Sequence, residues 1–325
     1  MPATMTHAYF AIDVFNKLDG NSKMAIKNNL LQYKMFSQST DPLMFYNIET
    51  LKPGKSIRSF QYTFHATKSQ LFFCSLVDNI KRYNLENDPS VLAYLYGMIC
   101  HYVLDSNVHP FVFYKTGKFV KTDKSTYKYN NVHSFMETFI DIEMMKRNGI
   151  NSPYGFRIDN FTFDLGEFNE GLNLIIDSTF SYVFGINNMS TIYYTSLVHM
   201  KRFLKRYMID DTGIKRMLYK MIDKCLPKYI FRFEALSYHY KCRYGDFFLN
   251  SKRDIWYNPV DPSICSYDSF DDLYNKSIQE AVFIINSVDA YLHGKNINLK
   301  LIFKNKSYIS GLDCNIGLNF KKFAF

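Results

Sequence analysis

The chain has 325 residues and a formal net charge of +9, and 47% of its residues are apolar and 18% aromatic. These values favour one large globular enzyme over a modular binding protein. No apolar run reaches the roughly 18 residues of a membrane-spanning helix, and the chain start lacks the features of a signal peptide, so we expect a soluble, cytoplasmic protein.

Apolar residues recur at helical spacing over most of the chain. In the first half this pattern predicts helices over residues 8–18, 22–35, 68–84, 89–107 and 133–148. Pro110 is expected to end the ligand-bearing helix that begins at residue 89, and the polar stretch 115–131 is expected to be a loop. In the second half the pattern predicts helices over residues 166–185, 190–208, 212–226, 230–243 and 268–293.

The whole pattern predicts an all-α, multi-helix fold. We divide it into a catalytic core at 1–150, a helical extension packed on the core at 151–295, and a tail at 296–325. The tail alternates apolar and polar residues around two glycines, which predicts a small hairpin or an edge strand. No linker rich in Pro, Gly or Ser separates these segments, so we expect one continuous globular unit.

Basic residues cluster in residues 115–128, 201–206 and 215–216. Such clusters favour anionic lipid surfaces or nucleic acid as partners. Solvated helix faces are the simpler interpretation of each cluster.

The most informative motif places His101, Asp105 and His109 four residues apart on one apolar helix. Residues at i and i+4 have Cβ atoms roughly 5–6 Å apart, so His101 and Asp105 can bind one cation while His109 reaches a second. A buried Asp in this setting needs a positive partner, and no Lys or Arg occurs between Arg82 and Lys115. The motif therefore predicts a metal site.

His133 and Glu137 repeat the i, i+4 spacing on the next predicted helix. A zinc protease needs two His ligands around a general-base Glu, so the order His-x-x-x-Glu does not indicate proteolysis. Alone, the pair fits a surface contact. Together with His109 it makes three ligands that leave one position for water, which is the pattern of a catalytic zinc.

Three residues before these motifs carry further candidate side chains: His7, Asp41 and His65. In order, residue type and spacing, the whole set resembles the zinc-dependent phospholipase C family, whose fold is shared with secreted single-strand nucleases. The resemblance covers about residues 1–145. The opening Met-Pro-Ala-Thr-x-Thr-His is similar to that of bacterial intracellular-type members.

The resemblance implies a site for two or three Zn²⁺ ions. It assigns the first zinc to His65, His101 and Asp105, the second to His109, His133 and Glu137, and the third to His7, the other oxygen of Asp105 and the first residue of the chain. Asp41 matches the family's carboxylate that holds the attacking water or acts as general base.

The first residue differs from that of the secreted relatives, which begin with a Trp that chelates the third zinc. This chain begins Met1-Pro2. If Met1 is removed, Pro2 becomes the first residue and its amine can bind metal once it is deprotonated. Pro2 is therefore a ligand on that condition.

These assignments predict a phosphodiester hydrolase of the phospholipase C type, in which a metal-activated water attacks phosphorus. The expected substrate is a phospholipid or a related phosphodiester, and the expected partner surface is an anionic membrane. Pro42 stands where choline-cleaving relatives carry an aromatic residue, so Tyr62 is the candidate for an aromatic wall.

Two alternatives stay open at this point. One is a nuclease or nucleotidase that uses the same zinc cluster, although nucleic acid is the less favoured partner. Its aromatic candidates for base stacking are Tyr62, Phe64, Tyr114, Phe119 and Tyr127. The other is a non-catalytic zinc protein that binds a phosphorylated ligand, which the presence of Asp41 argues against.

Overall fold

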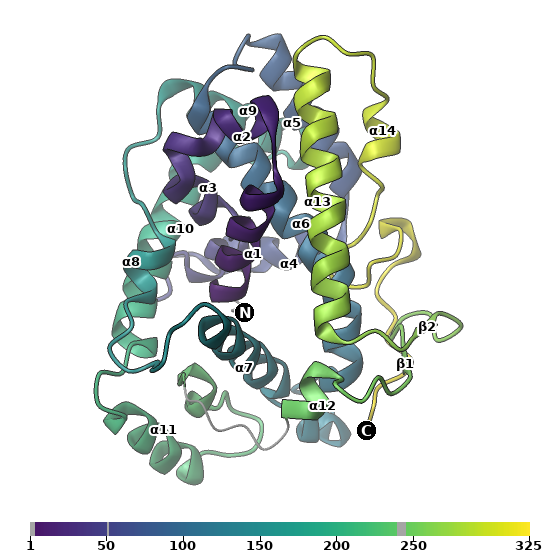
Figure 1. Cartoon of the computed structure of the whole chain (residues 1–325). Coiled ribbons are helices and arrows are strands. Elements are labelled where there is room, and N and C mark those ends of the chain that lie inside the picture. The colour runs from purple at the N-terminus through teal and green to yellow at the C-terminus, as the bar shows by residue number, and fades with distance from the viewer. Residues whose placement is uncertain (1–3, 51, 239–244) are drawn as a thin grey trace.

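The fold is all-α, as the sequence predicts, in a computed structural model that describes residues 4–50, 52–238 and 245–325 (Figure 1). Its α-helices in chain order are α1 (Thr4–Lys17), α2 (Gly20–Ile26), α3 (Leu30–Phe36), α4 (Lys55–Ala66), α5 (Ser69–Arg82), α6 (Pro89–Thr116), α7 (Val132–Arg147), α8 (Ile158–Thr162), α9 (Glu170–Phe184), α10 (Met189–Phe203), α11 (Ile214–Cys225), α12 (Gly245–Leu249), α13 (Phe270–Leu292) and α14 (Leu299–Ile302).

Shorter elements connect these helices. The 3₁₀ helices span Lys27–Asn29, Asp41–Phe45, Lys124–Tyr129, Phe233–Leu236 and Cys314–Ile316, and a π-helical turn at Leu204–Met208 continues α10. The strands β1 (Trp256–Tyr257) and β2 (Cys265–Ser266) form an antiparallel pair.

Helix α6 lies at the centre of the fold. It begins where the carboxylate of Asp88 accepts hydrogen bonds from the backbone N–H groups of Ser90 and Val91, with Pro89 at the first helical position. Helices α1, α3, α7 and α13 pack around it, and Figure 1 shows α13 alongside it. Most of α6 is therefore buried, including its ligand-type side chains.

The predicted end of α6 is wrong, because the helix continues through Pro110 to Thr116. Proline removes one N–H donor from a helix and so leaves the carbonyl of residue i−4 without its helical partner. Here that carbonyl belongs to Ser106, and Gly311 packs directly against it. A Cβ at Gly311 would overlap the Ser106 oxygen, and its φ of +67° also favours glycine. The C-terminal segment thus covers α6 at its proline.

The tail differs from the predicted hairpin. Leu299–Ile302 form α14 because the side chain of Asn298 accepts the N–H of Lys300 and caps a short helix. Strand-like pairing within the described tail is limited to one antiparallel bridge, between Lys306 and Asp313. The rest of the tail packs over α4 and α6 through hydrogen bonds and close contacts.

Two further helices differ from the prediction. The helix expected over 22–35 is divided into α2, a 3₁₀ turn and α3. The helix expected over 230–243 is replaced by a 3₁₀ turn, because the carboxylate of Asp223 accepts the N–H groups of Phe233 and Glu234. Residues 239–243 of that prediction lie outside the described residues.

Helix α4 was not predicted, although it carries His65. Its apolar residues are mainly aromatic and stand in a polar stretch, so the helical pattern is weak in the sequence. Phe60 and Phe64 pack against Phe184 and Phe180 of α9, with ring centroids 5.0 and 5.7 Å apart. Contacts distant in sequence therefore stabilise α4.

One apolar cluster runs from Met5 to Tyr308 and includes residues of all three predicted segments. The boundaries at residues 150 and 295 stay predictions. Among the described residues, helices that combine the length and the apolar character needed to cross a membrane are absent.

Replacing Gly311 by Ala should destabilise the fold more than the same change at Gly317. Both glycines have positive φ, but a Cβ at Gly317 meets no atom within 4 Å. We expect Gly317→Ala to lower the free energy of unfolding by about 1–3 kcal/mol, because φ +75° with ψ −178° is essentially restricted to glycine, and Gly311→Ala to lower it by a further ~1–3 kcal/mol from overpacking. Denaturant unfolding measures both, and equal losses would contradict the close packing of Gly311 on α6.

Candidate metal centre

The predicted side-chain ligands meet where four helices and one 3₁₀ turn converge. They are His7 on α1, Asp41 at the start of the turn, His65 on α4, His101, Asp105 and His109 on α6, and His133 and Glu137 on α7. Within the described residues these side chains form three groups whose ligand atoms lie within 4.8 Å of one another: His7 with His101 and Asp105, Asp41 with His65 and His101, and His109 with His133 and Glu137.

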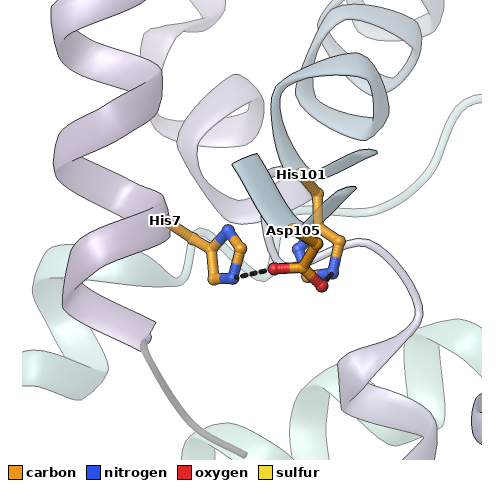
Figure 2. A group of neighbouring side chains, drawn as sticks. All are labelled: His7, His101 and Asp105. Atoms are coloured by element: carbon orange, nitrogen blue, oxygen red, sulfur yellow. Dashed lines mark ion pairs between the residues drawn. The ribbon is translucent and has the colours of Figure 1, made fainter. Parts of the chain in front are cut away.

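Figure 2 shows one carboxylate oxygen of Asp105 turned toward His7, with the side chain of His101 next to the carboxylate. Its Oδ1 is 3.3 Å from Nε2 of His7, whereas its Oδ2 is 3.0 Å from Nε2 of His101 and 3.6 Å from Nε2 of His65. The two oxygens thus face different histidines, an arrangement that suits a carboxylate shared by two cations.

Nearby imidazoles keep Asp105 ionised. Burial alone would raise the pKa of this carboxyl group, but the positive potential of His101, His109 and His7 holds the pKa well below its usual range. A buried negative charge of this kind is stable only with a compensating positive charge.

Backbone carbonyls orient three of the imidazoles. The Nδ1 atoms of His65, His101 and His109 lie 2.9, 2.9 and 3.0 Å from the carbonyl oxygens of Gln61, Ser37 and Tyr308. A carbonyl oxygen only accepts hydrogen bonds, so each Nδ1 donates and each Nε2 presents a lone pair when the ring is neutral. This is the usual support of a metal-binding histidine.

The Nε2 lone pairs of His65 and His101 face each other, and this contact shows whether the residues fit a metal. Nε2 of His65 is 3.1 Å from Nε2 of His101, and Oδ2 of Asp105 is close to both. In the described part of the chain, Nδ1 of His7 is buried without a hydrogen-bond partner, and Oδ2 of Asp105 is buried with only imidazole nitrogens close to it. A pocket lined by acceptors needs protons or a metal cation, and zinc binds imidazole nitrogen and carboxylate oxygen. The residues fit zinc.

Asp41, which was predicted to hold the attacking water, also lies close to the imidazole of His65. Its Oδ1 is 3.4 Å from Nε2 of His65 and accepts a hydrogen bond of 2.8 Å from Nε2 of Gln61. Gln61 therefore fixes the Asp41 carboxylate so that one of its oxygens lies within 4.8 Å of the ligand nitrogens of His65 and His101.

The third group lies nearer the surface. Oε1 of Glu137 is 3.0 Å from Nε2 of His133 and 3.7 Å from Nε2 of His109. His133 lines a cavity of about 370 Å³. The cavity wall includes Lys118 and Phe119 of the stretch predicted as a loop at 115–131, so this stretch borders the group.

Sequence reasoning missed Asp141, which lies one turn after Glu137 on α7. Its Oδ1 accepts both the N–H and the hydroxyl of Thr6 at 2.7 Å, and its Oδ2 accepts the hydroxyl of Tyr238 at 2.8 Å. The i, i+4 spacing that found Glu137 would also have found Asp141. The helix that carries the third group thus also anchors the start of α1 beside His7.

It also missed Tyr308, whose backbone joins two groups. Its N–H donates to the carbonyl of His65 at 2.9 Å, and its carbonyl accepts Nδ1 of His109. The hydroxyl of Ser307 donates to the same His65 carbonyl at 3.2 Å. Backbone contacts leave no mark in the residue pattern, so the sequence offers no signal for this role.

Other predicted site residues have different fates. Tyr62 lies on α4 with 48% of its surface exposed, so it stays a candidate. Phe64 and Tyr114 are buried in the core and cannot offer a face for base stacking, so these two predictions are wrong. Met1 and Pro2 lie outside the described residues.

Comparison with known proteins gives one match. A family model described as zinc dependent phospholipase C matches residues 5–185, more than half of the chain. The matched region contains all the predicted side-chain ligands. No curated protein and no solved structure matches the chain.

The zinc-free protein should lose stability as the pH rises from 6.5 to 9. Burial alone would lower the pKa of His109, but Asp105 and Glu137 raise it to about 9, so stability falls by about 3 kcal/mol as the pH rises from 6.5 to 9. Burial raises the pKa of Asp141 to about 7, and, against the effect of burial, Asp105 raises the pKa of His101, so both groups add to this fall as the pH rises.

Denaturant unfolding of chelator-treated protein at several pH values measures this profile. His109→Gln should reduce the fall above pH 6.5, and saturating zinc should also reduce it because the metal replaces the proton on His109. Stability of the zinc-free wild type that rises between pH 6.5 and 9 would contradict the electrostatic account.

Proposed function

Because the chain belongs to the zinc-dependent phospholipase C family, we propose that it hydrolyses a phosphodiester bond in a phospholipid or a related compound. One observation carries this proposal. The buried carboxylate of Asp105 turns its two oxygens toward different histidines, and Asp41 lies beside one of those sets. A structural zinc site has no need of such an additional carboxylate.

The proposed ligands are those of the three groups. His65, His101 and Oδ2 of Asp105 would hold one zinc, with Asp41 beside it; His109, His133 and Glu137 would hold a second; and His7 with Oδ1 of Asp105 would hold a third, completed by Pro2 if Met1 is removed. His101 stands in two of the groups, and its Nε2 is closest to Oδ2 of Asp105, which favours the first zinc.

Zinc bound there would lower the pKa of water and neutralise the phosphoryl oxygens. In this proposal Asp41 orients the attacking water and accepts its proton. Gln61 fixes the carboxylate by donating to Oδ1, which leaves Oδ2 for the water. Attack at phosphorus breaks the bond to the alcohol oxygen and releases an alcohol and a phosphomonoester.

The cavity beside His133 is the proposed substrate site. Its volume of about 370 Å³ is in the range of small-molecule sites, roughly 300–1,000 Å³. Aromatic rings, among them Phe113 and Phe119, line it together with Lys118. A cationic and aromatic wall suits a phosphate that is attached to an apolar chain.

The nuclease alternative has less support. With Phe64 and Tyr114 buried, three of its stacking candidates are left: Tyr62, Phe119 and Tyr127. Turnover of single-stranded DNA or RNA in place of phospholipid would establish this alternative.

Two substitutions separate the metal-binding role from the catalytic role. Asp105→Asn should lower the zinc content by two ions, because each oxygen is assigned to a different zinc. Asp41→Asn should lose at most one, because His65, His101 and Asp105 still provide three ligands. It should also lower turnover by about 10²–10⁴-fold, the contribution of a general base.

Elemental mass spectrometry gives the zinc content, and hydrolysis of a generic phosphodiester and of phospholipid vesicles gives the turnover. Asp289→Asn is the control, because Asp289 is a buried carboxylate bound to the hydroxyl of Tyr96 away from the proposed ligands. Equal zinc loss in both site variants would contradict the assigned roles. A wild-type protein with zinc but without turnover would contradict the hydrolase.

A further inference from the structure

Helix α11 is attached to the protein by its polar side. The ammonium group of Lys215 donates to the carbonyls of Arg206 and Ile209 at 2.8 and 2.6 Å, and the hydroxyl of Tyr219 donates to the carbonyl of Tyr207 at 2.8 Å. The sequence suggested that the basic pair at 215–216 belongs to a solvated helix face, but Lys215 is bonded to the protein.

The next turn of α11 repeats this attachment. Asp223 accepts the backbone N–H groups of Phe233 and Glu234, and Lys220 forms an ion pair of 3.2 Å with Glu234. Arg232 donates to the carbonyl of Asp223 at 2.6 Å. Bonds to the protein thus occupy the polar side of the helix.

The apolar side of α11 points to solvent. Five residues at i, i+3, i+4, i+7 and i+8 spacing are 43–58% exposed, and we call them the docking face: Ile214, Met217, Leu218, Met221 and Ile222. An apolar stripe with this spacing normally faces the core. In α11, which is described in full, the only other exposed residues are Lys224 and Cys225.

The docking face lies near the cavity at His133. Tyr229 and Phe231 follow α11 in the chain, are 41% and 38% exposed, and line that cavity. The ammonium group of Lys121 lies 5.8 Å from the ring centroid of Tyr229, so the stretch 115–131 lies alongside. Figure 1 places α11 at the lower edge of the molecule, beyond α7.

The charge of this region is positive. Lys121, Lys224 and Lys228 are exposed near the apolar residues, and the whole chain carries a net charge of +9. Two copies of the chain would repel each other at such a surface, whereas an anionic surface would attract it. Helices with one exposed apolar face and nearby lysines are typical of proteins that lie on an anionic bilayer.

We propose that the docking face, with Tyr229 and Phe231 beside it, inserts into the surface of an anionic phospholipid bilayer. The helix then lies in the plane of the bilayer, and its polar side stays bonded to the protein. This inference rests on the proposed function, because the same contact would bring the cavity at His133 to its lipid substrate. The bilayer contact itself does not require turnover.

The binding test uses the full chain and vesicles of equal parts phosphatidylcholine and phosphatidylglycerol. Co-sedimentation is measured in an Asp41→Asn background, so that the vesicles stay intact. Met217→Gln/Met221→Gln should lower the vesicle partition coefficient at least ~10-fold, about 1.4 kcal/mol. The matched control is Met24→Gln/Leu301→Gln, whose residues are 67% and 73% exposed on α2 and α14 and which should bind as the parent does.

Unchanged binding of the Met217→Gln/Met221→Gln protein, or an equal loss in the control, would overturn the proposal. The proposal would also be overturned if the parent protein were a dimer and the Met217→Gln/Met221→Gln protein a monomer with unchanged vesicle binding. A second copy of the chain would then cover the docking face. Binding to pure phosphatidylcholine vesicles that equals binding to the mixed vesicles would overturn the anionic preference.

Turnover by proteins that retain Asp41 distinguishes the bilayer contact from the proposed hydrolase function. In this comparison the wild type, the Met217→Gln/Met221→Gln protein and the Met24→Gln/Leu301→Gln protein all keep Asp41. The docking-face variant should hydrolyse a water-soluble phosphodiester as fast as the wild type and vesicle phospholipid at least ~10-fold more slowly. A wild type that hydrolyses neither substrate but sediments with vesicles through the docking face refutes the hydrolase and supports the bilayer contact.

Discussion

The structure depends on one buried carboxylate in a pocket of hydrogen-bond acceptors. Asp105 is surrounded by imidazole nitrogens from α1, α4 and α6, and three of the five site histidines have their Nδ1 atoms fixed by carbonyls. Acceptor atoms this close repel one another unless protons or metal cations lie between them. Because the cluster draws its side chains from several helices, we expect metal binding to stabilise the packing of these helices.

The second half of the chain takes part in this centre. The family match ends at residue 185, yet the Tyr308 backbone positions His65 and His109, and Gly311 packs against the Ser106 carbonyl, which Pro110 leaves without its helical N–H donor. The hydroxyl of Tyr238 supports Asp141, which anchors the start of α1. Residues that lack ligand atoms thus fix the geometry of those that have them.

The sequence indicated which side chains meet at the candidate site, but it gave little sign of the contacts that hold these side chains in place. Fixed i, i+4 spacing marks His101, Asp105 and His109, because a helix places such residues on one face whatever surrounds it. The role of Tyr308 rests on backbone atoms and leaves no pattern. Helix α4 was missed because aromatic contacts with α9 stabilise it from far along the chain. The periodicity of α11 predicted where the helix lies in the chain but not which side faces the protein. Hydrogen bonds from its polar side chains to other segments determine that orientation.

X-ray absorption at the zinc edge of protein purified without chelator tests the central claim most directly. The account predicts zinc bound only to nitrogen and oxygen, at about 2.0–2.2 Å. Cys100 adjoins His101 in sequence, but its thiol is buried against the hydroxyl of Tyr33 at 3.0 Å, so a sulfur ligand is not expected. A sulfur shell near ~2.3 Å, or a protein without zinc, would contradict the account.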